Sequence, residues 1–188
     1  MDINQNTVLF RSLMPEDVEK IVGYWLGSPP SFIESMGIDP TKLPDAAKMR
    51  SSLLLKAATN LEKGDQFATQ LIILYHGQAV GLHGLSHIEE GCGVFHAHIW
   101  DSKHRGQGLG TYTYPRACRI FLDRFQLQKI RFESPCMNPA IHAIKSKLNL
   151  SPISEAVMDQ SQMIEGTTAK VYEINRNDLD RLYAAARD

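Results

Sequence analysis

Apolar positions in the first third of the chain repeat with the spacing of one short strand and two helices. Val8–Leu13 has the composition of a strand, and Pro15 opens a helical pattern that continues to about Leu26. A proline is tolerated there because the first turn of a helix has no partner for its N–H groups. Ala46–Lys63 repeats apolar residues along one side of a second helix. Between the two helices, Ser31–Pro44 has no period and predicts an irregular segment.

Three runs rich in β-branched and aromatic residues occupy the middle of the chain and predict consecutive strands. They cover Phe67–Tyr75, Ala79–Ser86 and Val94–Trp100. His76-Gly77-Gln78, between the first two runs, has the composition of a hairpin turn, and Gly91–Gly93 marks another turn. We therefore expect this half of the sheet to be antiparallel.

Helices and strands alternate in the second half of the chain. A charged, glycine-rich loop at Asp101–Gly110 leads into a helix, in which Pro115 predicts a kink or a late start because it lacks an N–H group. Lys129–Ser134 predicts a strand and Pro139–Leu148 a short helix. The remaining predicted elements are a weak strand near Ile153–Met158, a strand at Lys170–Ile174 and a terminal helix at Asn177–Arg187.

This order of elements is typical of a mixed α/β (α+β) domain with a mainly antiparallel sheet flanked by helices. The 188 residues fit one domain that spans residues 1–188, with its main motifs in 67–150 and a terminal helix at 177–188. No repeat, low-complexity tract or interdomain linker interrupts the pattern.

Charge and composition narrow the class of partner. The chain is 43% hydrophobic and 22% charged, and its formal net charge is −1, which argues against nucleic acid or an anionic membrane as a general partner. Three cysteines without paired spacing, Cys92, Cys118 and Cys136, favour reduced thiols over a disulfide framework. No signal peptide and no membrane-spanning run is evident, so we expect a cytoplasmic protein.

The strongest local motif is the loop Arg105-Gly106-Gln107-Gly108-Leu109-Gly110, which follows a strand and opens a helix. Free N–H groups and partial positive charge at a helix start suit phosphate, and glycine lets the backbone approach it closely. A dinucleotide-binding fingerprint needs glycine where Thr111 stands, and a P-loop needs Lys-Ser/Thr in place of Thr111-Tyr112. Both of those phosphate sites are therefore excluded, and a plain tight turn stays the alternative.

The sequence resembles the GNAT superfamily of N-acetyltransferases at two motifs. That family carries Arg/Gln-x-x-Gly-x-Gly/Ala at a strand-to-helix turn, which Arg105, Gly108 and Gly110 match. Asn138 and the segment Lys147-Leu148-Asn149-Leu150 resemble the second motif, in the subgroup that acetylates ribosomal-protein N-termini and assorted small amines. Asn149-Leu150 departs from the usual Gly-Phe of that subgroup.

The resemblance implies that acetyl-CoA, the co-substrate, lies in a cleft where two central strands splay apart. The backbone of His98, Ile99 and Trp100 is expected to pair with the pantetheine arm, and Asn138 to bind it from the other side. Asn138 is also a candidate N-cap of the helix that starts at Pro139. The residues implied around the pyrophosphate are Arg105, Gly106, Gln107, Gly108, Leu109, Gly110 and Thr111.

Acyl transfer to an amine benefits from a base, because an alkylamine is protonated at neutral pH. Glu133 is the first candidate, since the resemblance places a catalytic glutamate five residues before Asn138; the alternative is an ion pair with Arg131. His98 is the second candidate. It shares a strand face with His96, and two such histidines also allow a metal site, although no third ligand has convincing spacing, so no metal is expected.

The resulting prediction is an N-acetyltransferase that moves an acetyl group from acetyl-CoA to a primary amine of a small molecule or of a peptide or protein N-terminus. Lys145 stands where many relatives of this kind have a tyrosine that acts as the general acid. That departure motivates the alternative, a non-catalytic acyl-CoA-binding module. We expect acceptor contacts from Ser28–Pro44 and His83–Gly93; a homodimer stays open.

Overall fold

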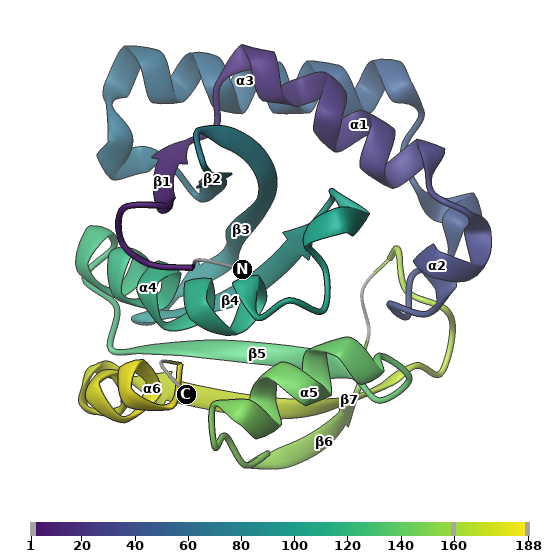
Figure 1. Ribbon diagram of the computed structural model, residues 1–188. Helices are drawn as coiled ribbons and strands as arrows, with labels where there is room; N and C mark the ends of the chain where they lie inside the picture. The colour runs from purple at the N-terminus through teal and green to yellow at the C-terminus, as the bar shows by residue number, and fades with distance from the viewer. Residues whose placement is uncertain (1–2, 159–160, 187–188) are drawn as a thin grey trace.

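One seven-stranded sheet organises the chain in the computed structural model, which describes residues 3–158 and 161–186. The strands follow the order β1-β2-β3-β4-β5-β7-β6 (Figure 1). Their bounds are Val8–Ser12 (β1), Gln70–Tyr75 (β2), Gln78–Glu89 (β3), Cys92–Ile99 (β4), Lys129–Pro135 (β5), Ser154–Val157 (β6) and Thr168–Asn175 (β7). The helices are α1 Val18–Gly27, α2 Pro30–Glu34, α3 Ala46–Lys63, α4 Leu109–Arg124, α5 Pro139–Lys147 and α6 Leu179–Ala185. The predicted mixed fold and mainly antiparallel sheet are confirmed.

The strands β1 to β4 form an antiparallel unit whose turns follow from local sequence. His76 and Gly77 both have positive φ, 48° and 77°, as the tight hairpin between β2 and β3 requires. Side chains alternate across the sheet, so Leu82 and Ile72 face α1 and α3, and join a core that includes Ile21 and Leu53. In Figure 1, α1 and α3 lie together along this side of the sheet.

The opposite face of the sheet packs on α4. Its core contains Phe95, Tyr114, Phe121 and Phe132, and the rings of Phe95 and Phe132 lie 5.4 Å apart between centroids. The helix α4 begins at Leu109 and runs through Pro115 without interruption. The late start, one of the two predicted effects of Pro115, therefore does not occur.

The connection between β4 and β5 is the exception to antiparallel pairing. These strands are parallel, and only three residue pairs join them, the last being Val94↔Arg131. Beyond that pair the strands diverge, as Figure 1 shows. The predicted central splay is therefore present, and the other half of the sheet, β5-β7-β6, continues antiparallel on its far side.

Two details differ from the sequence prediction. The segment Ser31–Pro44 is not wholly irregular, because α2 and a 3₁₀ turn at Pro40–Lys42 occupy much of it. The terminal helix α6 is shorter than expected, since Arg176–Asp178 forms a 3₁₀ turn before it. The weakly patterned strand near Ile153–Met158 exists as β6 and lies at the edge of the sheet.

Candidate active site

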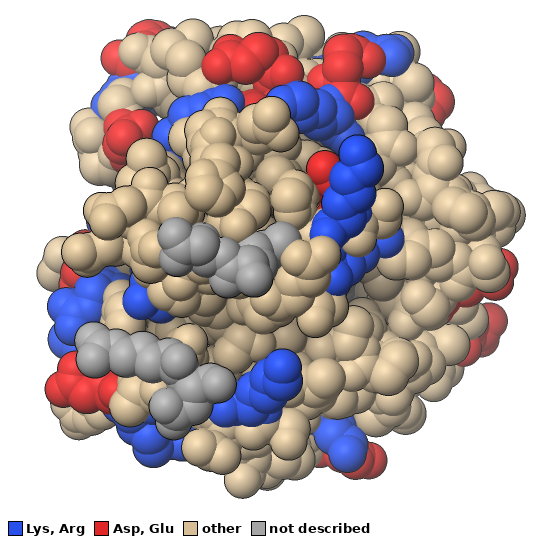
Figure 2. Space-filling model, in the orientation of Figure 1, with Lys and Arg blue, Asp and Glu red and all other residues tan. Residues whose placement is uncertain are grey.

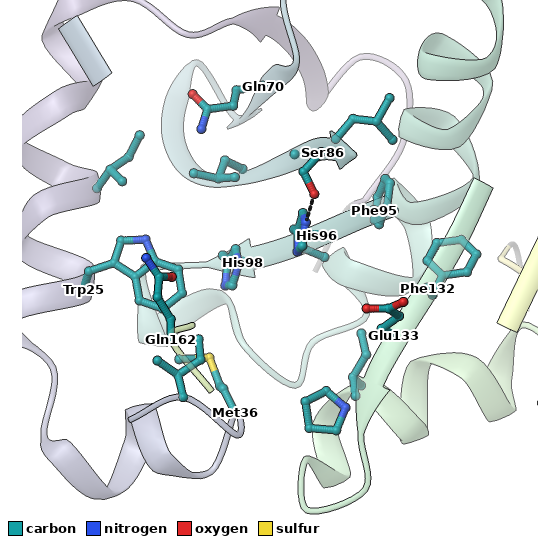
Figure 3. Close-up of a pocket in the computed structure, with 18 of the residues that line it drawn as sticks. Trp25, Met36, Gln70, Ser86, Phe95, His96, His98, Phe132, Glu133 and Gln162 are labelled. Atoms are coloured by element: carbon teal, nitrogen blue, oxygen red, sulfur yellow. Dashed lines mark hydrogen bonds between the residues drawn. The ribbon is translucent and has the colours of Figure 1, made fainter. Parts of the chain in front are cut away.

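A cavity of about 380 Å³ opens beside the splay and reaches between β4 and β5. Helices α1 and α3 and the segment after α2 form one wall, and β5 with the start of α5 forms the other. In Figure 3, His96 and His98 project from β4 into this space, and Glu133 extends toward them from β5. The cavity therefore collects three candidate residues from two strands that barely pair.

Beyond its last pair with β5, the strand β4 has an open edge. The N–H of Trp100 donates to the Val80 carbonyl of β3 at 3.0 Å, so it is directed into the sheet and away from the splay. In an antiparallel pair such residues alternate with residues whose N–H and C=O point the other way. Ala97 and Ile99 therefore direct their backbone groups toward the splay, and the sequence analysis did not single out Ala97.

Arg105 closes the end of this edge. Its Nε donates to the carbonyl of Ile99 at 2.8 Å and its guanidinium also donates to the carbonyl of Trp100 at 3.0 Å. The same guanidinium lies 4.4 Å from the centroid of the Phe32 ring. The backbone N–H of Arg105 donates to the carbonyl of Ser102. The side chain of Arg105 thus anchors the loop to β4.

The backbone N–H groups from Gly106 to Thr111 form a row without partners. Within the described chain none of them donates a hydrogen bond, and the first N–H of α4 that does so is that of Tyr112, to Gly108. Gly108 adopts the left-handed conformation, with φ of 88°, immediately before the helix. A Cβ on Gly110 would come within 2.9 Å of the Ile144 side chain, so glycine also permits the close packing of α4 on α5. This row is a ready site for an anion.

The surface around this region has few acidic side chains. In the face shown in Figure 2, mainly uncharged and basic side chains occupy the middle, and acidic ones lie mostly toward the margins. A phosphate group approaching this face meets little electrostatic repulsion.

His98 is buried against aromatic residues of α1. Its Nδ1 lies 3.2 Å from the hydroxyl of Tyr24, and its ring meets that of Trp25 edge-on at 4.8 Å. Burial, and to a smaller extent the neighbouring His96, lower the pKa of His98 to about 3. The imidazole is therefore neutral at physiological pH and accepts a proton poorly.

His96 lies on the same face of β4, two residues before His98. Its Nε2 is 2.7 Å from the hydroxyl oxygen of Ser86, as Figure 3 shows. Burial lowers the pKa of His96, and the charge of nearby Glu133 partly opposes that shift. The predicted shared face of His96 and His98 is confirmed, and among the described residues no group of three histidine, cysteine or acidic side chains is arranged for a metal.

Glu133 lines the cavity and also pairs with Arg131. The Nε of Arg131 donates to its carboxylate at 3.0 Å, and the Glu133 side chain keeps 24% of its surface exposed. Arg131 is shared, because Glu173 of β7 lies 3.8 Å from its other guanidinium nitrogen. The ion pair that the sequence analysis left as an alternative therefore exists, and it places the carboxylate at the cavity edge.

Asn138 caps α5 at the opposite side of the splay. Its Oδ1 accepts a hydrogen bond from the N–H of Ile141 at 3.3 Å, and the residue also lines the cavity. The capping role expected from the sequence is thus present. Among the described residues, no hydrogen bond is made by the amide nitrogen of the same side chain.

Lys145 is fully buried and has no carboxylate beside it. It is 1% exposed, its Nζ lies 2.9 Å from the Tyr114 hydroxyl oxygen, and the Phe132 ring centroid is 3.2 Å from the same nitrogen. Burial lowers the pKa of Lys145 well below its ordinary value. The residue at the position expected for a general acid is therefore a buried amine with a lowered pKa, behind Tyr114, which itself lines the cavity.

Comparison with known proteins identifies the fold. At the level of sequence, no protein-family model and no curated protein matches the chain. Solved structures match over nearly the whole length. RimJ of Mycobacterium smegmatis, in complex with a CoA disulfide, aligns with a TM-score of 0.72 and 14% identity, covering 96% of this chain and 90% of its own.

Two further structures extend this likeness. An acetyltransferase of the GNAT family from Bacillus anthracis gives a TM-score of 0.69 at 13% identity, covering 94% of this chain and 99% of its own. RimL, a ribosomal L7/L12 α-N-protein acetyltransferase in complex with coenzyme A, gives 0.70 at 11% identity, covering 91% and 95%. The chain has the GNAT acetyltransferase fold, and several structures with that fold hold CoA.

The lowered pKa of Lys145 predicts the pH dependence of stability. In the unfolded chain a lysine is charged below about pH 10.4, so the folded chain holds this proton less tightly than the unfolded chain does. This penalty grows as the pH falls below 10.4 and vanishes above it. We expect Lys145→Met, in a Tyr114→Phe background that leaves no orphaned hydroxyl, to unfold at higher urea concentration than Tyr114→Phe alone at pH 7.

The difference between these two proteins should narrow as the pH rises toward 10. Urea denaturation at pH 7, 8.5 and 9.5 measures it. A destabilised Lys145→Met protein with a gap independent of pH would mean that the lysine is charged in the folded state.

Proposed function

We propose that this protein is an N-acetyltransferase that moves the acetyl group of acetyl-CoA to a primary amine. The observation that carries the proposal is the row of unpartnered N–H groups at Gly106–Thr111, next to the open edge of β4. The first feature suits the pyrophosphate of coenzyme A, and the second suits an extended arm with amide groups. The cavity beyond them provides the place where an amine reaches the thioester.

In this proposal the coenzyme is held by backbone more than by side chains. Gly106, Gln107, Gly108, Leu109, Gly110 and Thr111 bind the pyrophosphate. The N–H of Ile99, whose carbonyl is held by Arg105, and the backbone groups of Ala97 pair with the pantetheine arm, because the N–H of Trp100 is directed to β3. Asn138 offers its free amide N–H groups from the other side of the splay.

Glu133 is the proposed base. The amine nitrogen forms a bond to the thioester carbonyl carbon and gives up a proton, the carbon–sulfur bond breaks, and the thiolate leaves and takes up a proton. Burial lowers the pKa of His98 to about 3, so its imidazole accepts a proton poorly. The carboxylate of Glu133 lies at the same cavity, on the strand that faces β4 across the splay.

The acceptor classes that fit are a small amine and a peptide N-terminus, since a neighbouring structure is described as an α-N-protein acetyltransferase. None of the helices in the described chain is long and apolar enough to cross a bilayer. We propose the cytoplasm as the place of action, in keeping with free thiols at Cys92, Cys118 and Cys136.

The coenzyme site is tested by a charge placed in the loop. We expect Gly108→Asp to weaken acetyl-CoA binding at least about tenfold relative to Gly108→Asn, because the two side chains have one shape and only the first repels phosphate. Asparagine tolerates the left-handed backbone of this position, so it controls for strain. Calorimetric titration with acetyl-CoA measures both variants. Equal affinity of the two variants would mean that the pyrophosphate does not bind at this loop.

The base is tested by Glu133→Gln, which keeps the shape of the side chain and removes its basicity. We expect kcat/KM in a thiol-release assay to fall by about 10²–10⁴-fold at pH 7.5, with acetyl-CoA affinity unchanged. The loss should shrink as the pH rises, because more of the amine is then already neutral.

Glu173→Gln is the matched control, since Glu173 contacts the same Arg131 but does not line the cavity. It should retain near wild-type turnover. Loss of turnover in His98→Ala together with full activity in Glu133→Gln would move the role to the histidine. Coenzyme binding without thiol release from any amine would instead establish a non-catalytic acyl-CoA-binding module.

A further inference from the structure

The acceptor end of the cavity is built from apolar side chains. They come from α1, from the segment after α2 and from α3, and they surround the space in front of His98. The members are Ile21, Trp25, Met36, Leu43, Met49 and Leu53. Such a wall stabilises the apolar body of a ligand and gives nothing to a charge.

The ionisable groups that line the cavity leave no spare negative charge for a second cation. Of the described residues in its wall, Glu133 is the single carboxylate, and it already receives the guanidinium of Arg131. Lys56 contributes a positive charge of its own. The pKa values of the two half-buried histidines are lowered, so their imidazoles add no charge at neutral pH.

The end of the cavity near Met36 is crossed by backbone from the other half of the sheet. The chain between β6 and β7 bridges to the segment after α2 through the pair Ile38↔Met163. Asp39 donates its N–H to the Gln162 carbonyl at 2.9 Å, and Ile164 donates to the Gly37 carbonyl at 3.0 Å. Figure 3 shows Gln162 and Met36 together at this end. The crossing limits how far an acceptor extends past the histidines.

We infer that the acceptor is a small monoamine on an apolar, uncharged body, and that amines with a second positive charge are excluded. This inference rests on the proposed acetyl transfer and specifies its substrate class. One amine loses its charge when it becomes the nucleophile, so it needs no counter-ion in the cavity. A second ammonium would stay charged and lose its water without gaining a carboxylate partner, because the remaining polar groups of the wall, such as Gln70, are neutral, and this is unfavourable.

A matched pair of amines tests the inference. Hexylamine and pentane-1,5-diamine have the same chain length and differ by a methyl group in place of the second ammonium. With purified protein and acetyl-CoA, thiol release should give hexylamine a kcat/KM at least about tenfold higher per amino group, since an unpaired ammonium is far harder to bury than a methyl group. Equal or better use of the diamine overturns the inference.

Binding separates this inference from the proposed function. Calorimetric titration of both amines into protein saturated with CoA should rank them in the same order, whether or not turnover occurs. If no amine releases thiol but hexylamine binds and the diamine does not, the acetyl transfer fails and the cavity's preference stands. If neither binds, or the diamine binds more tightly, the preference itself is refuted.

A carboxylate added to the wall should reverse part of the selectivity. Gln162→Glu is isosteric, lies at the exposed rim of the cavity and adds the missing negative charge. We expect it to raise kcat/KM for the diamine several-fold relative to hexylamine. Gln78→Glu, the same change on an exposed hairpin that does not line this cavity, should leave the ratio unchanged. An unchanged ratio in Gln162→Glu, or an equal shift in Gln78→Glu, contradicts the inference.

Discussion

The short pairing between β4 and β5 is the constraint on which the rest of the site depends. Only three residue pairs join these parallel strands. Beyond them, β4 stays in the half of the sheet that α1 and α3 cover, while β5 continues its pairing with β7. The divergence leaves backbone groups of Ala97 and Ile99 without a strand partner. It also opens the space in which side chains from both strands meet. A fully paired sheet of the same residues would have no open edge and no cavity.

Leaving β4 and β5 unpaired over this stretch costs free energy, and contacts at both of its ends offset that cost. Below it, the rings of Phe95, Tyr114 and Phe132 pack against α4 and keep the two halves of the sheet in one core. At the far end, Arg105 holds the carbonyls that end β4. The bridge Ile38↔Met163 joins the halves once more. The two strands are therefore separated only over the stretch that a ligand would fill.

The second feature of the site is that burial lowers the pKa values of two basic side chains, His98 and Lys145. His98 and Lys145 are enclosed by aromatic rings and lose their tendency to carry a proton. Their lowered pKa values indicate that the interior of the splay holds a positive charge poorly, whereas Glu133 stays at the half-exposed edge of the splay with Arg131. In the proposed reaction, the amine binds in this interior and its proton is received at the edge.

Much of the fold was accessible from local pattern, because strand alternation and helix periodicity reflect which side chain faces the core. The helix α3, the hairpin at His76-Gly77 and the glycine loop before α4 follow from residues adjacent in the sequence. The shared face of His96 and His98 follows from the period of a strand.

Long-range geometry had no such local signal. The direction of the Trp100 N–H depends on its pairing with Val80, the isolation of Lys145 depends on rings from α4 and β5, and the bridge at Ile38 joins segments more than a hundred residues apart. The resemblance implied a catalytic role for Glu133, but its placement near His96 depends on two strands separating after Val94. Local preference sets which face a side chain occupies, but the charge it carries there is set by what the folded chain packs around it.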